Sequence, residues 1–191
     1  MRPALKAALI FSVSWILLKF LFLYLGIFQN EIFYSGLLNN FFLLAAIALG
    51  LYLEKKKEGF GEGTALSDIK NAMIAGAPYA LIVSVFMYFY YQDINPDFVE
   101  NRVTERMDLV YNSMQRDTYV DSLKMQNKDF KVMTDEEIYK QIYQETESAF
   151  SPKSLLTFSL LGLLILGFTY SILITAIYRK VLFRDYYSKS E

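Results

Sequence analysis

Four long apolar runs constrain this chain more than any other feature of its sequence. They cover residues 7–28, 33–53, 69–91 and 155–178. A helix needs about 20 consecutive apolar residues to cross the hydrocarbon core of a bilayer, and each run is long enough. The apolar residues come in blocks and not in amphipathic periods. The pattern therefore predicts an all-α membrane protein with four transmembrane helices.

The first run follows Arg2 and Lys6, as the apolar part of a signal peptide would. It is longer than the roughly 7–15 residues of such a region, and it lacks a convincing site with small residues on either side of a cleavage point. We expect an uncleaved first span.

The positions of lysine and arginine predict the orientation of the spans. Basic residues cluster before the first run, between the second and third, and after the fourth: Arg2, Lys6, Lys55, Lys56, Lys57, Lys70, Arg179, Lys180, Arg184 and Lys189. Short segments rich in such residues stay in the cytoplasm. The other two connections are the short one at 29–32, which carries Glu31, and the acidic one at 92–153. We expect both ends of the chain in the cytoplasm and the long connection outside.

Composition excludes much familiar chemistry. The chain has no cysteine and no histidine, and its formal net charge is -1. Disulfides, thiolate nucleophiles, imidazole bases, zinc ligation by these side chains and the Ser-His-Asp arrangement are therefore ruled out. There is also no basic excess of the kind that nucleic-acid binding needs. We expect no enzyme, no cofactor, no metal and no nucleic-acid partner.

The connection at 54–68 contains a lysine triplet, Lys55 to Lys57, and three alternating glycines, Gly59, Gly61 and Gly63. The glycines do not form a phosphate-binding loop, because no Gly-Lys-Ser/Thr follows them. They favour a flexible turn before a helix capped by Thr64 or Ser67. The lysine triplet is interpreted as setting the topology and touching anionic headgroups.

The outer connection is predicted to be helical. Asn95 is predicted to be the N-cap of a helix with Pro96 at its first position, and apolar residues at intervals of three and four then predict that this helix covers 96–116. Thr134 and Glu137 match a capping box that opens a second helix, which ends before Pro152. The stretch 117–133 is left unassigned. We interpret the acids at 135–137 as a favourable helix start and not as a calcium site.

These observations divide the chain into three parts. Residues 1–92 hold the first three spans with the Lys/Gly-rich connection, 93–153 form the extracytoplasmic helical segment, and 154–191 hold the fourth span with a tail. Two outer helices bury little apolar area alone. They should therefore pack on each other, on the mouth of the bundle or on a partner.

Small residues recur at intervals of four along three of the spans: Ala46 and Gly50; Ala72, Gly76 and Ala80; Gly167, Ser171 and Thr175. Such stripes let helix backbones approach closely, in a compact bundle or at the seam of a homo-oligomer. Pro78 lies inside the third span, where it predicts a kink.

Lys19 is the only charged residue well inside a span. Asn39, Asn40 and Ser84 lie at a similar depth, about 10–12 Å from the outer ends of their spans at about 1.5 Å per residue. Helical spacing places Lys19 on one face of the first span, shared with Ser12, Trp15 and Gly26. Two alternatives stay open. Either Lys19 snorkels to the outer headgroups, or it donates to Asn39 or Asn40 and marks the floor of an outward-facing polar cavity. In the second case these four polar residues are the candidate ligand site.

The whole arrangement resembles an uncharacterised family of small four-span bacterial membrane proteins, known only as a domain of unknown function. The residues that carry the resemblance are Glu58-Gly59, Gly63-Thr64-Ala65-Leu66, the run 69–91 and Asn95-Pro96-Asp97-Phe98. The resemblance implies a bacterial inner membrane. It carries over no catalytic or binding residue.

Three functions compete. The first is a non-enzymatic scaffold or accessory subunit that engages a protein partner through residues 93–153. The second is a small transporter or channel with a polar cavity around Lys19, although no internal repeat supports an inverted-repeat carrier. A lipid-active enzyme ranks last, because no paired acids with a nucleophilic or basic companion lie at a predicted membrane mouth. Membrane lipids surround the spans in every case.

The orientation has a direct test. Cysteines introduced at Lys56, Gln115 and Ser188 should differ in labelling by a membrane-impermeant thiol reagent in intact spheroplasts. Only the cysteine at position 115 should react. Labelling at position 56 would reverse the predicted orientation.

Overall fold

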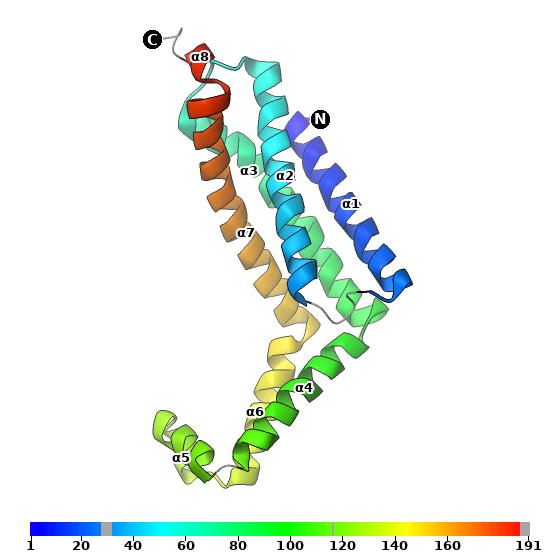
Figure 1. Cartoon of the computed structure of the whole chain (residues 1–191), viewed down its shortest axis with the longest axis vertical. Coiled ribbons are helices and arrows are strands. Elements are labelled where there is room, and N and C mark those ends of the chain that lie inside the picture. Colours follow the sequence, from blue (N-terminus) through cyan, green and yellow to red (C-terminus); the bar gives the residue numbers. More distant parts are fainter. Residues whose placement is uncertain (28–31, 116, 188–191) are drawn as a thin grey trace. The chain divides into compact units, whose positions relative to one another are not determined.

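The computed structural model describes residues 1–27, 32–115 and 117–187 of the chain. It is 89% helical, and it has no β-strand among these residues (Figure 1). The chain divides into two compact units, Met1–Phe86 with Thr157–Glu191, and Met87–Leu156. Phe28, Glu31, Arg116, Ser188 and Lys189, to which the sequence assigned roles, lie outside the described residues.

The four predicted membrane helices are confirmed. The described residues contain four helices that are long and apolar enough to cross a membrane. They are α1 (Pro3–Leu25), α2 (Ile32–Glu58), α3 (Ala65–Phe89) and α7 (Pro152–Ile177). A short π-helical segment follows two of them: η1 (Tyr90–Ile94) continues α3, and η3 (Tyr178–Leu182) continues α7 before the short α8 (Arg184–Tyr187).

Several helices extend past the apolar runs because their ends are capped or polar. Helix α2 continues through the lysine triplet, whose positive charge suits the C-terminal end of a helix. Helix α3 begins four residues before its apolar run, because Thr64 Oγ1 accepts a hydrogen bond from the Ser67 backbone N at 3.2 Å. Thr64 is therefore the cap, one of the two predicted. Pro78 lies inside α3, which is continuous from Ala65 to Phe89, and the kink at Pro78 stays a prediction.

The small-residue stripes bring helices of the same chain together. A Cβ atom built on Gly76 would lie 3.8 Å from Gly167 Cα, so α3 and α7 approach closely at these two glycines. A Cβ atom on Gly50 would lie 2.7 Å from Ala75 Cβ and 3.4 Å from Ala4 Cα. Gly50 thus sits where α2 meets both α1 and α3. The stripes serve the packing of this four-helix unit.

The second unit contains α4 (Asp97–Met114), α5 (Asp117–Gln126), the 3-10 helix η2 (Asp129–Val132) and α6 (Asp135–Phe150). The two helices predicted in this stretch are confirmed as α4 and α6, and α5 and η2 fill the part that the sequence left unassigned. Two apolar clusters hold the unit together, one around Val103, Met107 and Val110 and the other around Val120, Phe130 and Ile138. Met114 and Ile142 pack against both clusters and so join them.

The two predicted helix starts have different outcomes. For α4 the N-cap residue is Pro96, with no side-chain cap, so the assignment of Asn95 as the cap was wrong by one position. For α6 the capping box is confirmed. Thr134 N donates to Glu137 Oε2 at 2.7 Å, and Glu137 N donates to Thr134 Oγ1 at 3.3 Å. The hydrogen bonds from the Thr134 backbone and hydroxyl lower the pKa of the exposed Glu137 carboxyl.

The close contact at Gly50 predicts that a methyl group added there destabilises the protein more than a methyl group added at Gly162. Gly50→Ala should destabilise the protein by about 1–3 kcal/mol, because the new methyl meets an alanine Cβ that only a helix shift can move. Gly162→Ala is the control, since a Cβ atom there has no neighbour within 4 Å. It should change stability by less than about 1 kcal/mol. Thermal unfolding in mild detergent measures both, and equal effects would contradict the tight seam.

Candidate functional site

Lys19 points into the four-helix unit. Its exposure is 4%, and Nζ donates to Ser35 Oγ on the first turns of α2 at 3.2 Å. Ser12 and Trp15 share this buried face of α1, as expected, whereas Gly26 is exposed. The acceptor that the structure gives Lys19 is one turn before the expected Asn39, and sequence reasoning missed it. A serine on an apolar helix gave no signal, because serine often bonds to its own helix.

The other three candidate residues have separate surroundings. The Tyr79 hydroxyl on α3 donates to Asn39 Oδ1 at 2.6 Å, so Asn39 belongs to a bond between α2 and α3. Asn40 is half-buried. Ser84 is fully buried, and its Oγ has no hydrogen-bond partner among the described residues. The predicted polar layer thus contains a Lys19–Ser35 pair, an Asn39–Tyr79 pair and an unpaired hydroxyl. Its role as a ligand site stays a prediction.

The most buried charges lie elsewhere, at the end of this unit where α1 begins and α8 lies (Figure 1). Asp68 and Lys55 are 1% and 2% exposed, and Lys55 Nζ lies 2.6 Å from Asp68 Oδ1. Arg179 Nη1 lies 2.6 Å from Asp68 Oδ2. One buried carboxylate therefore joins α2, α3 and the segment after α7. We call these three residues the Asp68 cluster.

The glycine-containing connection is fastened to the Asp68 cluster. Lys55 Nζ also donates to the Glu62 carbonyl, and both terminal nitrogens of Arg179 donate to the Gly63 carbonyl at 3.2 Å. Gly63 has a φ of 80°, which glycine adopts without strain. A Cβ atom on it would lie 3.5 Å from Lys55 Nζ. The connection is therefore a built element and not only the flexible turn that its glycines suggested.

Two further contacts lie at the same end, and the first of them joins α1 to α2. The buried carboxylate of Glu54 accepts from the backbone N of Ala4 at 3.3 Å and so satisfies a free donor at the start of α1. Phe60 of the connection stacks on Phe183 at a ring-centroid distance of 4.5 Å. The interpretation of Lys55 as a residue that touches headgroups was wrong, because the side chain is buried. Lys56 and Lys57 are exposed.

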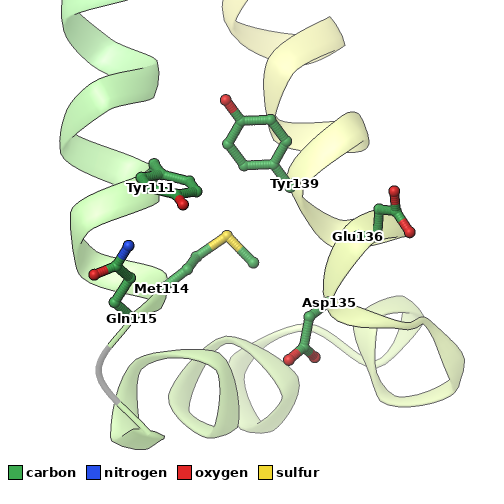
Figure 2. Close-up of a pocket in the computed structure, with 6 residues that line it drawn as sticks. All are labelled: Tyr111, Met114, Gln115, Asp135, Glu136 and Tyr139. Atoms are coloured by element: carbon green, nitrogen blue, oxygen red, sulfur yellow. The ribbon is translucent and has the colours of Figure 1, made fainter.

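The second unit carries three adjoining hollows. The first has a volume of about 400 Å³ and lies between the end of α4 and the start of α6 (Figure 2). Its walls include Tyr111 and Tyr139, whose ring centroids are 6.5 Å apart at 81°. Figure 2 shows the Met114 side chain reaching from α4 into the space between the two helices. Asp135, at the rim, pairs with Lys124 Nζ at 3.0 Å.

Two more hollows adjoin the first along α6. The second, of about 550 Å³, shares Glu136 and Tyr139 with it. The third, of about 480 Å³, shares Tyr143 with the second and continues to Glu147 and Pro152. We call the face formed by these three hollows the α6 surface. Helix α6 has 16 residues and rises about 24 Å, so this surface is extended and suits a chain segment better than a small molecule.

The described residues contain no group of three acidic, histidine or cysteine side chains placed to hold a metal ion. The acids at the start of α6 serve other contacts. Asp135 pairs with Lys124, and Glu137 closes the capping box. The chemistry that this arrangement offers is recognition by aromatic rings and carboxylates.

Four apolar helices in one packed unit define the chain as a multi-pass integral membrane protein. It belongs to the family described as "Protein of unknown function (DUF4199)", whose model matches residues 6–180. This match confirms the resemblance to a family of small membrane proteins that is known only as a domain of unknown function. No curated protein and no solved structure matches the chain.

Asp68 and Asp135 both lie in the first turn of a helix, and each pairs with a lysine. The burial of the Asp68 cluster predicts that replacing Asp68 lowers stability much more than replacing Asp135. Asp68→Asn should destabilise the protein by about 3 kcal/mol or more, because it leaves Lys55 buried without its counter-ion. Asp135→Asn is the control. The side chain of Asp135 is 65% exposed, and its pair with Lys124 should contribute less than about 1 kcal/mol. Denaturation in mild detergent compares the two, and equal losses would contradict a structural role for the cluster.

Proposed function

We propose that this protein is a non-enzymatic accessory subunit or scaffold that binds a protein partner through the α6 surface. The observation that carries the proposal is the row of adjoining hollows along α6. Tyr139 and Tyr143 stand one turn apart and each lines two of them. Tyrosine is enriched at the centres of protein interfaces, because its ring buries a large area and its hydroxyl still bonds.

The charges on the α6 surface favour a basic partner. Carboxylates line all three hollows, among them Glu136, Glu147 and Glu100, whereas Lys140 is the one basic residue in their lining among the residues that the structure describes. An arginine of a partner could stack on a tyrosine ring and bond to a neighbouring carboxylate at the same time. We therefore infer a partner segment that carries arginine or lysine.

The distribution of basic residues supports a location for this surface. With both chain ends and the lysine triplet in the cytoplasm, residues 93–153 face the opposite side of the membrane. The family resemblance favours the inner membrane of a bacterium. The partner segment is then periplasmic or belongs to another membrane protein.

A second candidate function is transport of a small polar solute. It is favoured by the buried Lys19–Ser35 pair and by the unpaired Ser84 hydroxyl, because polar groups inside a membrane often line a path. Solute flux in liposomes that Lys19→Met abolishes would support it.

A photo-crosslinking amino acid at position 143 tests the partner proposal in native membranes. Illumination should give one discrete adduct with a second protein, identified by mass spectrometry. Glu136→Lys in the same chain should lower the adduct yield by about tenfold, because like charges across an interface are repelled. Asp108→Lys is the matched control, since Asp108 is an exposed acid of α4 that lies outside the hollows, and it should leave the yield unchanged.

Three outcomes would contradict the proposal. The first is no adduct, and the second is an adduct that Glu136→Lys and Asp108→Lys reduce equally. The third is an adduct with a second copy of this chain, which would replace the partner by a homo-oligomer.

A further inference from the structure

A hollow on the four-helix unit has a lining quite unlike that of the α6 surface. It has a volume of about 490 Å³ and lies beside α3, from Leu66 to Pro78, with Phe168 of α7 as a further wall. Every lining residue is apolar except Lys70. We call it the Lys70 groove. It runs along a membrane-spanning helix, so hydrocarbon chains surround it.

Small side chains on α3 leave the space open. Ala77 contributes only a methyl group, and beside it Met73, Ile74 and Pro78 are half-buried. Gly76, next to Ala77, is at the close approach to Gly167, which places Phe168 of α7 at this level of the groove. The groove therefore follows from the same close packing that joins α3 to α7.

The length of the groove matches one leaflet. From Leu66 to Pro78 the helix rises about 18 Å, against about 15 Å for half of a hydrocarbon core. The Leu66 end is the start of α3, where an interface with water is expected, and Lys70 lies within the first two turns. A lipid chain in the groove would place its headgroup at this end.

No residue that the structure describes neutralises the positive charge of Lys70. Lys70 is exposed and has no ion pair or hydrogen bond to any other residue that the structure describes. The nearest carboxylate along the chain, Asp68, is buried between Lys55 and Arg179. Glu58 accepts a hydrogen bond from Asn71 at 3.2 Å. The ammonium of Lys70 is thus available to a ligand beside an apolar groove.

We propose that the Lys70 groove binds one phospholipid with a net negative headgroup. One acyl chain lies along Ile74 and Ala77, and the phosphate contacts Lys70. The proposal does not depend on the α6 surface, which belongs to the other unit. It concerns a specific site, in contrast to the general attraction of exposed lysines such as Lys57 to anionic headgroups.

Native mass spectrometry of the full chain in mild detergent tests this site. The probe is an equal mixture of phosphatidylglycerol and phosphatidylcholine with identical acyl chains. The natural sequence should retain one phosphatidylglycerol about fivefold in preference, the factor expected for one lysine at an anionic surface. Lys70→Gln should remove the preference. Lys57→Gln, which removes the same charge from an exposed position outside the groove, should keep it.

A second variant tests the apolar part of the site. Ala77→Phe should fill the groove and lower retention of both lipids. If the natural sequence retains the two lipids equally, the bound lipid is non-specific and the proposal is overturned. Equal effects of Lys70→Gln and Lys57→Gln, or unchanged retention in Ala77→Phe, would also overturn it.

Discussion

The packing of the four-helix unit depends on one buried carboxylate. Asp68 would be costly at the end of a membrane helix if it stood alone, because transfer of an ion from water costs several kcal/mol even after relaxation. Lys55 and Arg179 compensate this cost at 2.6 Å each. The compensation requires α2, α3 and the segment after α7 to meet at one point. The ion pairs therefore add geometric specificity to helices whose apolar faces could slide on one another.

The glycines add close contacts further along the same helices. Gly50 lies where α2 meets α1 and α3, and Gly76 and Gly167 lie where α3 meets α7. The same approach leaves the hollow beside Ala77. The second unit is held by other forces, mainly two apolar clusters between α4, α5 and α6. Its interior is small, and its tyrosines and carboxylates remain partly exposed.

The sequence predicted well whatever depends on local chemistry. Apolar runs of about 20 residues identify spans because the bilayer offers backbone groups no alternative to a helix. The capping box at Thr134 was readable because its two residues are three positions apart. The Asp68 cluster was not readable, since Asp68 and Arg179 are 111 positions apart and a lysine beside a span already has an ordinary explanation. The partner of Lys19 was missed for another reason. Ser35 and Asn39 lie on the same face of α2, and Ser35 is one turn, about 6 Å, nearer to the start of the helix, so the estimate of depth was wrong by one turn.

The separation of Asp68 from Arg179 has a consequence for how the protein is made. Synthesis proceeds from the N-terminus, so α3 enters the membrane while Lys55 is present and Arg179 does not yet exist. Asp68 and Lys55 form a neutral pair in that period. The guanidinium arrives only after a further 111 residues, including the whole of the second unit, have left the ribosome. The last helix to be inserted thus completes the ionic contacts of α2 and α3, and a chain that ends before Arg179 would keep its spans and lack the ion pair that joins the segment after α7 to them.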